Sequence, residues 1–210
     1  MKKPVGWVDE GNPTIIQNYH VGSRSSTPTY RSLIFTKIRY SIMKNSREIL
    51  VEWWYDKIDI ESITQWADTF VKNNDNIPEE VFELFYAPKY HFEDIFLSLS
   101  LADDPDFSPQ SLSAEILAAE YLVSIVKRYL NNEITPIDIC RVINNIDSGF
   151  MDAPRNLPDN IAYYPCWLGN LYHSCDWCDD TWTNISAPYL KQDLENQLPH
   201  IIDWIESHNP

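Results

Sequence analysis

The chain has 210 residues, of which 44% are hydrophobic and 22% charged, and its 31 acidic and 16 basic side chains give a net charge of −15. This composition favours a folded globular protein over a disordered chain, in which low hydrophobicity accompanies high charge. No apolar run approaches the roughly 20 residues that a membrane-spanning helix needs, and no apolar stretch follows the charged start. We therefore expect a cytoplasmic protein without a membrane anchor.

The charge is unevenly divided along the chain. Residues 1–47 carry eight bases and two acids, a net +6, whereas residues 48–210 carry eight bases and 29 acids, a net −21. The negative charge of residues 48–210 repels nucleic-acid phosphate, which argues against direct DNA or RNA binding. The same charge raises the association rate of a basic partner. Solubility alone also explains an acidic surface.

The first 29 residues are irregular, because prolines and glycines interrupt them repeatedly. We expect either a short β-hairpin, with strands at residues 6–9 and 14–19, or an irregular arm that packs on the body. Residues 30–210 are predicted to form a single helical domain.

In that domain apolar residues recur at three- and four-residue steps, the spacing of an amphipathic helix. A first helix begins near Tyr30 and carries a basic face of Arg31, Lys37, Arg39 and Lys44. Residues 48–55 fit either a strand or a helix, and we favour the helix. Asp59 is predicted to cap a helix over residues 60–72, and Pro78 to begin the next.

Five further helices are expected towards the C-terminus. One covers residues 91–101, and Ser108-Pro109 opens a long central helix that ends near Asn131. Thr135-Pro136 opens another by the same signal, and residues 161–178 form one helix interrupted near Pro165 and Gly169. Ser186 is predicted to cap the last helix, residues 188–207, and Pro199 to kink or split it. Helices without regular strands indicate an all-α, irregular bundle.

A group of thiols and one imidazole offers the ligand types of a zinc site, namely Cys166, His173, Cys175 and Cys178. The spacing is unfavourable, because on one helix Cys175 points away from the face that Cys166 and His173 share. The other interpretation is that Cys140, Cys166 and one of Cys175 and Cys178 are small buried residues, reduced and without a disulfide.

Three carboxylates next to these cysteines are the candidate binding residues. Asp176, Asp179 and Asp180 have the i, i+3, i+4 spacing of one helical face, with Trp177 and Trp182 between and after them. Clustered acids repel one another unless a cation lies near. That cation is the chain's own basic helix, a basic partner protein that the tryptophans anchor, or a metal ion.

Catalytic motifs are missing from the sequence: it contains no GxSxG, HExxH, GxxxxGK[ST] or GxGxxG, and its five histidines are scattered. We therefore expect no enzyme activity and no cofactor.

Two segments resemble the C-terminal half of small bacterial immunity proteins. They read ITPIDICRVINNID (residues 134–147) and YPCWLGNLYHSCDWCDD (residues 164–180), and the resemblance extends over roughly residues 134–190. Such proteins are encoded beside polymorphic toxins, including those of contact-dependent growth inhibition and of type VI effectors. The resemblance implies a non-catalytic cytoplasmic inhibitor that binds a cognate toxin, often a basic nuclease, and occludes its active site.

Two other functions remain open from the sequence. One is a zinc-binding or metal-dependent enzyme that uses Cys166, His173, Cys175 and Cys178. The other is a regulatory or scaffolding module whose basic residues 1–47 bind an acidic ligand.

Overall fold

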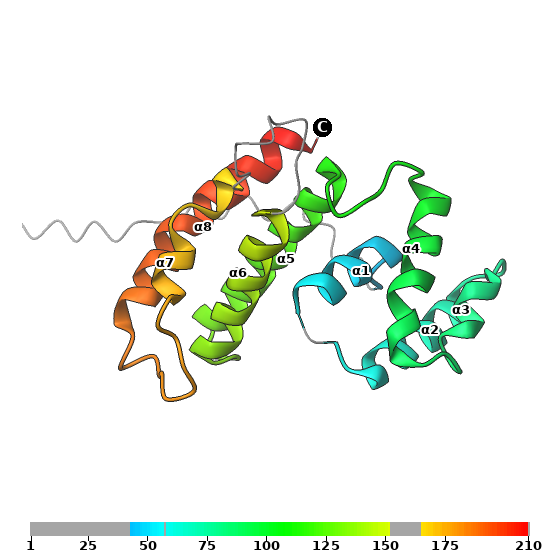
Figure 1. Cartoon of the computed structure of the whole chain (residues 1–210), viewed down its shortest axis with the longest axis horizontal. Coiled ribbons are helices and arrows are strands. Elements are labelled where there is room, and N and C mark those ends of the chain that lie inside the picture. The colour runs from blue at the N-terminus through cyan, green and yellow to red at the C-terminus, as the bar shows by residue number, and fades with distance from the viewer. Residues whose placement is uncertain (1–42, 57, 152–164, 210) are drawn as a thin grey trace, which may run out of the picture. The chain divides into compact units, whose positions relative to one another are not determined.

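The computed structural model describes residues 43–56, 58–151 and 165–209, all of which belong to one compact unit that spans residues 40–210. Over these ranges the chain forms eight α-helices and two 3-10 helices, and no strand (Figure 1). The predicted all-α class is confirmed. The predicted hairpin or arm of residues 1–29 and the helix beginning near Tyr30 lie outside the described residues.

Side-chain caps fix the starts of the first two helices. Helix α1 (Ser46–Tyr55) begins with a capping box, in which Asn45 accepts from the Glu48 backbone and the Glu48 carboxylate accepts from the Asn45 backbone. The helical interpretation of residues 48–55 is thus correct. Asp59 caps α2 (Ile60–Asn73) by accepting from the Ser62 backbone, as predicted.

The next elements are short. Helix α3 (Glu79–Glu83) follows Pro78 and places Glu79 and Glu80 in its positive first turn. The 3-10 helix η1 (Lys89–His91) leads into α4 (Phe92–Asp103), which matches the helix predicted for residues 91–101.

Helix α5 (Leu112–Leu130) is the central helix that the sequence predicts, but it begins later than expected. Its cap is Ser111, which accepts from the Ala114 backbone, whereas Ser108 ends up in a turn that its carbonyl closes with the Ser111 N–H. Ala118, Leu122 and other α5 side chains are fully buried, so this helix forms the middle of the core.

After α5 the described residues form two long helices and two short ones. Helix α6 (Pro136–Met151) begins at the proline, as predicted. The helix predicted over residues 161–178 is instead, in its described part, the 3-10 helix η2 (Cys166–Leu168) and the five-residue α7 (Leu171–Cys175). Helix α8 (Pro188–His208) is continuous through Pro199, so of the predicted kink or split, the split does not occur.

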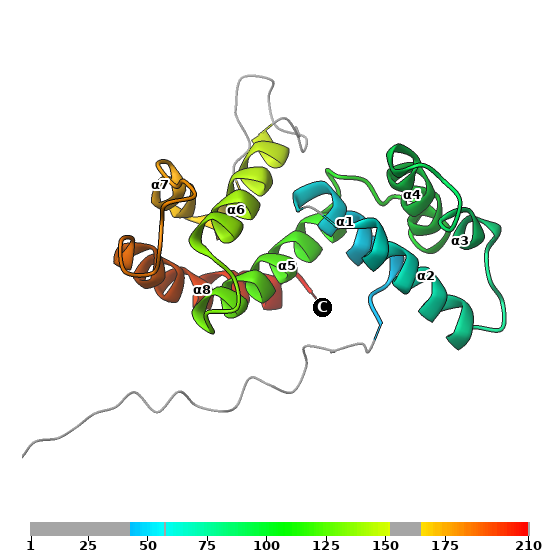
Figure 2. The same cartoon turned by 90° about the horizontal axis from the view of Figure 1, so that it is seen from below.

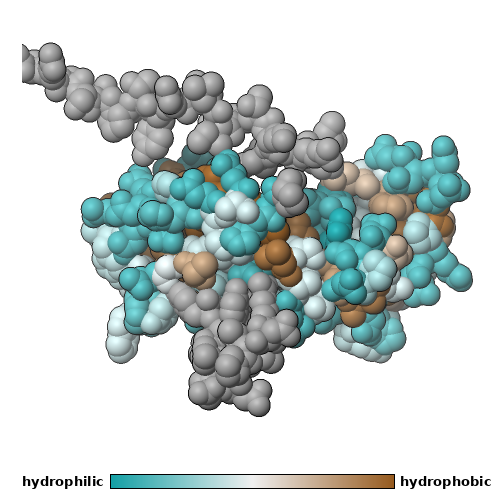
Figure 3. All heavy atoms as spheres, turned by 90° about the horizontal axis from the view of Figure 1, so that it is seen from above, coloured by the Kyte–Doolittle hydropathy of each residue, from teal (hydrophilic) through white to brown (hydrophobic). Residues whose placement is uncertain are grey.

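Helix α5 contacts α1 on one side and α6 and α8 on the other (Figures 1 and 2). Helix α4 packs against both α1 and α3. Helix α7 packs against both α6 and α8. The face drawn in Figure 3 is mainly hydrophilic, with small hydrophobic areas. No helix in the described ranges has the length and apolar character that crossing a membrane requires.

Candidate functional site

The predicted binding residues lie on a loop and not on a helix. Helix α7 ends at Cys175, and residues 176–187 form successive turns before α8 begins at Pro188. The expectation of three aspartates on one helical face is therefore wrong. They still lie within five residues of one 12-residue loop, whose two ends continue into α7 and α8.

All three aspartates are exposed, and the chain provides them with few partners. Asp176 Oδ2 lies 3.3 Å from His173 Nδ1. Asp179 accepts from the Thr181 hydroxyl at 2.5 Å and from its N–H at 2.8 Å, and these bonds hold the pKa of Asp179 below its usual range. Among the described residues, no lysine or arginine forms an ion pair with Asp176, Asp179 or Asp180.

Most of the described lysines and arginines pair with acids outside this loop. Five of them form ion pairs, namely Lys44–Glu52, Arg47–Asp104, Lys72–Asp68, Arg128–Glu133 and Arg141 with both Asp56 and Asp138. Of the basic helix that the sequence offers as internal counter-charge, Lys44 thus pairs with Glu52, whereas Arg31, Lys37 and Arg39 lie outside the described residues. Residues 165–209 carry seven acids and one base, a net −6.

The effect of this charge is visible on α6. Asp147 has its pKa raised, first by burial and then by the negative charge of Asp176. Of the three loop aspartates, Asp176 therefore lies close enough to α6 to affect Asp147.

Large hydrophobic side chains stand out from the same loop. Trp177 is 85% exposed and Ile185 is 90% exposed, whereas Trp182 is half-buried. The Trp182 ring packs edge-on against Tyr189 of α8, with 5.7 Å between ring centroids. Of the two predicted tryptophans, Trp177 is thus available to a partner and Trp182 mainly holds the loop to α8.

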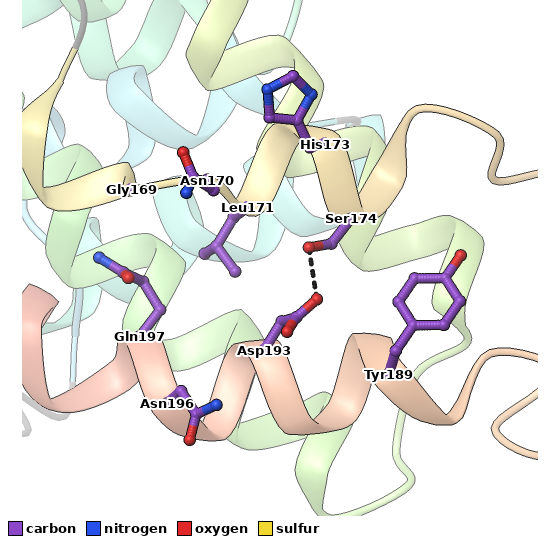
Figure 4. A pocket seen from close by; sticks show the side chains of 9 residues that line it. All are labelled: Gly169, Asn170, Leu171, His173, Ser174, Tyr189, Asp193, Asn196 and Gln197. Carbon is purple, nitrogen blue, oxygen red and sulfur yellow. Dashed lines mark hydrogen bonds between the residues drawn. The ribbon is translucent and has the colours of Figure 1, made fainter.

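An open groove of about 660 Å³ runs between α7 and α8, next to the loop (Figure 4). Most of its lining side chains are polar, with Leu171 as the apolar exception beside Gly169. The polar ones are Asn170, His173, Ser174, Tyr189, Asp193, Asn196 and Gln197.

Ser174 and Asp193 point toward each other across this groove from opposite helices (Figure 4). The Ser174 hydroxyl donates to Asp193 Oδ2 at 2.8 Å. At one end of the groove the Gln197 amide donates to the Trp167 carbonyl at 2.8 Å, which leaves the amide oxygen of Gln197 as an acceptor. The sequence analysis missed these residues, because amides and an aspartate on a helix face read as ordinary solvated positions.

The cysteines differ from the expectation of buried, reduced thiols. Cys140 of α6 and Cys175 of α7 form a disulfide with 5.2 Å between their Cα atoms, and Cys166 is exposed. Burial, together with the charge of Asp179, raises the pKa of the Cys178 thiol, which disfavours the thiolate that zinc binds.

The zinc site considered from the sequence therefore lacks one of its four ligands, since Cys175 is bonded to Cys140. Within the described ranges, no group of three or more histidine, cysteine or acidic side chains has a metal-binding arrangement.

No family model, curated protein or solved structure matches the chain. The resemblance to immunity proteins consequently stays a prediction, and the loop and the groove are the structural features that indicate a function.

Proposed function

We propose that the chain is a non-catalytic binding protein of the immunity type, which attaches to a basic toxin domain and covers its active site. The observation that carries the proposal is the loop of residues 176–187. It presents three exposed aspartates, to which the described residues offer no lysine or arginine, together with two strongly exposed hydrophobic side chains.

This combination suits protein recognition for physical reasons. Exposed tryptophan is costly in water and is the residue type that most often dominates binding energy at protein interfaces. Carboxylates beside it pair with lysine or arginine of the partner, and such pairs guide the encounter. A toxin whose active site binds an anionic substrate such as nucleic acid provides those basic groups, so covering them blocks the substrate.

The cytoplasmic location belongs to the same proposal, because an inhibitor of an intracellular toxin has to meet the toxin there. The cytoplasm is reducing, so a protein that works there has to stay folded when the Cys140–Cys175 disulfide is reduced, and this can be tested.

The experiment uses the toxin domain encoded by a reading frame next to this gene. The purified full chain should bind that domain and abolish its activity, and co-expression should restore growth. Trp177→Ala should weaken binding about 30-fold or more, the effect of losing an interface residue worth about 2 kcal/mol. Calorimetry gives the dissociation constant, and toxin activity gives the inhibition.

Tyr86→Ala is the matched control for the tryptophan. Tyr86 is 88% exposed in the turn after α3, next to the partly exposed Phe85. We expect its removal to change affinity less than about twofold, as at most positions outside an interface hot spot. If Tyr86→Ala abolishes binding and Trp177→Ala does not, the interface lies at α3 and the assignment to the loop is wrong.

A second pair of variants tests the charges at constant size. One neutralises the loop (D176N/D179N/D180N), and the other makes the same charge change at exposed positions elsewhere, between helices or at the last residue of α4 (D75N/D103N/D106N). Only the loop variant should weaken inhibition strongly. Equal effects would mean that net charge alone acts, and turnover of a substrate by the purified chain would overturn the inhibitor proposal.

A further inference from the structure

The α7–α8 groove differs chemically from the loop beside it. Its side chains offer hydrogen-bond acceptors in several directions: the Asp193 carboxylate, and the amide oxygens of Gln197, Asn196 and Asn170. No lysine or arginine lines it in the described part of the chain. The nearest base in sequence, Lys191, is two residues from Asp193 on α8 and so points to a different side of that helix.

Asp193 is the centre of the groove. The residue is half-buried, and Ser174, which is buried, fixes the carboxylate by donating to Oδ2. The other oxygen, Oδ1, accepts no hydrogen bond from the described residues. With Oδ2 occupied by the Ser174 hydroxyl, Oδ1 stays available to accept a hydrogen bond from a ligand.

An aromatic ring completes the surroundings. Tyr189 lines the groove at the end opposite Gln197 and is itself held by Trp182 (Figure 4). A planar cation that donates to a carboxylate and to amide oxygens, and whose face stacks on a phenol ring, is a guanidinium group.

We infer that the groove between α7 and α8 receives an arginine side chain of the basic partner, whose guanidinium donates to Asp193 Oδ1. This inference rests on the proposed function for the source of the arginine, but the recognition itself is a property of the groove. The loop then provides affinity around the edge, and the groove selects partners with an arginine at one position.

The test needs no toxin. The full chain, labelled with nitrogen-15, is titrated with the peptide acetyl-Gly-Arg-Gly-amide and followed by NMR. We expect the side-chain amide signals of Asn170, Asn196 and Gln197 to shift in a saturable manner, with a dissociation constant in the millimolar range. The same peptide with citrulline should bind at least about tenfold more weakly, because citrulline keeps the shape but loses the charge. The same peptide with lysine should also bind at least about tenfold more weakly, because an ammonium group lacks the planar set of donors that can reach both Asp193 and the amide oxygens.

Asp193→Asn should weaken the binding of the arginine peptide by at least about tenfold. Asp203→Asn, the same change at an exposed position further along α8, is the matched control and should leave the peptide affinity unchanged. Unfolding curves of both variants confirm that they are folded, and the comparison of arginine with citrulline in the unchanged chain does not depend on any variant.

Two results would overturn the inference: equal binding of the citrulline and arginine peptides, or an Asp193→Asn variant that binds arginine like the parent. Equal binding of lysine would overturn the guanidinium assignment in favour of a general cation pocket. If the arginine peptide binds but no toxin domain is inhibited, the proposed function is wrong, whereas the assignment of the groove as an arginine-binding site is supported. If Trp177→Ala abolishes inhibition while Asp193→Asn changes neither assay, the groove alone fails.

Discussion

Gly169 shows how a single residue shapes the groove. It joins η2 to α7 with φ +58° and ψ −135°, a backbone conformation that residues other than glycine rarely adopt. A Cβ placed there would lie 2.6 Å from the amide oxygen of Gln197. Glycine is therefore required twice, once for the turn and once so that Gln197 can reach the Trp167 carbonyl.

Gly169→Ala is accordingly expected to destabilise the chain by about 1–3 kcal/mol, the usual range for a strained backbone position. It should also shift the Gln197 amide signal in NMR spectra, because Gln197 has to move. Urea unfolding measures the free energy. Asn170→Ala, the next residue and an exposed one, is the control and should stay within about 0.5 kcal/mol of the parent. A Gly169→Ala chain as stable as that control would contradict this account.

Individual residues also show how far the sequence can be interpreted locally. The cap at Asp59 was predictable, because an aspartate before an apolar periodic run needs only its own neighbours to form the hydrogen bond. The aspartates at 176, 179 and 180 have helical spacing, yet Asp179 bonds to the hydroxyl and N–H of Thr181 and helps to form a turn instead. Short polar side chains compete with the helix in this way, and spacing alone does not decide the outcome.

At the scale of elements, the same helix-start signal predicted the starts of α6 and α8 correctly, but it placed the start of α5 too early and the cap of α8 on the wrong residue. A hydroxyl residue followed closely by proline does begin α6 at Pro136. At Ser108 no helix begins, because the Ser108 carbonyl accepts from the Ser111 N–H in a turn and α5 starts only after Ser111. The Ser186 hydroxyl accepts from the Thr183 N–H, which closes a turn before α8 and leaves α8 without a side-chain cap. Each competing turn lies within four residues of the signal, so short polar side chains close to the signal can move the start of a helix by a few residues.

Helix α7 is the element whose existence depends most on its neighbours. Five residues are too few for a stable isolated helix, so α7 is held by packing on α6 and α8 and by the Cys140–Cys175 disulfide. The sequence does not reveal that pairing, because four cysteines allow several and only the fold brings these two together.

Reduction of the disulfide should therefore cost about 2–4 kcal/mol of unfolding free energy, since the bond closes a loop between residues 35 apart. If the protein works in the cytoplasm, the reduced chain should still fold at 37 °C. Urea unfolding with and without reductant measures the loss, and thiol titration should count two free cysteines before reduction and four after it.

Cys166→Ser and Cys178→Ser are the matched controls, because both thiols are free and their removal leaves the bond intact. A chain that shows four free thiols without reductant, or the same stability in both conditions, would contradict the role given to the bond. A chain that unfolds on reduction would contradict the cytoplasmic location.

At the scale of the whole molecule, the distribution of ion pairs matters more than the net charge. The described bases that form ion pairs do so with acids of α1–α6 and the segments that join these helices, whereas the C-terminal segment keeps a net −6. An acidic body was predictable from composition. The groove beside it was not, because it arises only when α7 packs on α8 and brings residues 170–174 opposite residues 193–197.

Association with the toxin domain should therefore slow about tenfold or more when salt is raised from about 20 to about 150 mM, since the screening length falls to about 8 Å. The dissociation rate should change much less, because the close contacts are largely desolvated. Stopped-flow fluorescence measures both rates. An association rate that does not depend on salt would show that the acidic surface serves solubility only.

The exposure of Trp177 has a practical consequence. An indole with 85% of its surface in water emits at longer wavelength than the buried indole of Trp167, and soluble quenchers reach it directly. The neighbouring aspartates should make positively charged caesium a better quencher of this emission than negatively charged iodide. The chain thus carries an intrinsic optical reporter at the position where we place the partner, and complex formation can be followed without any attached dye.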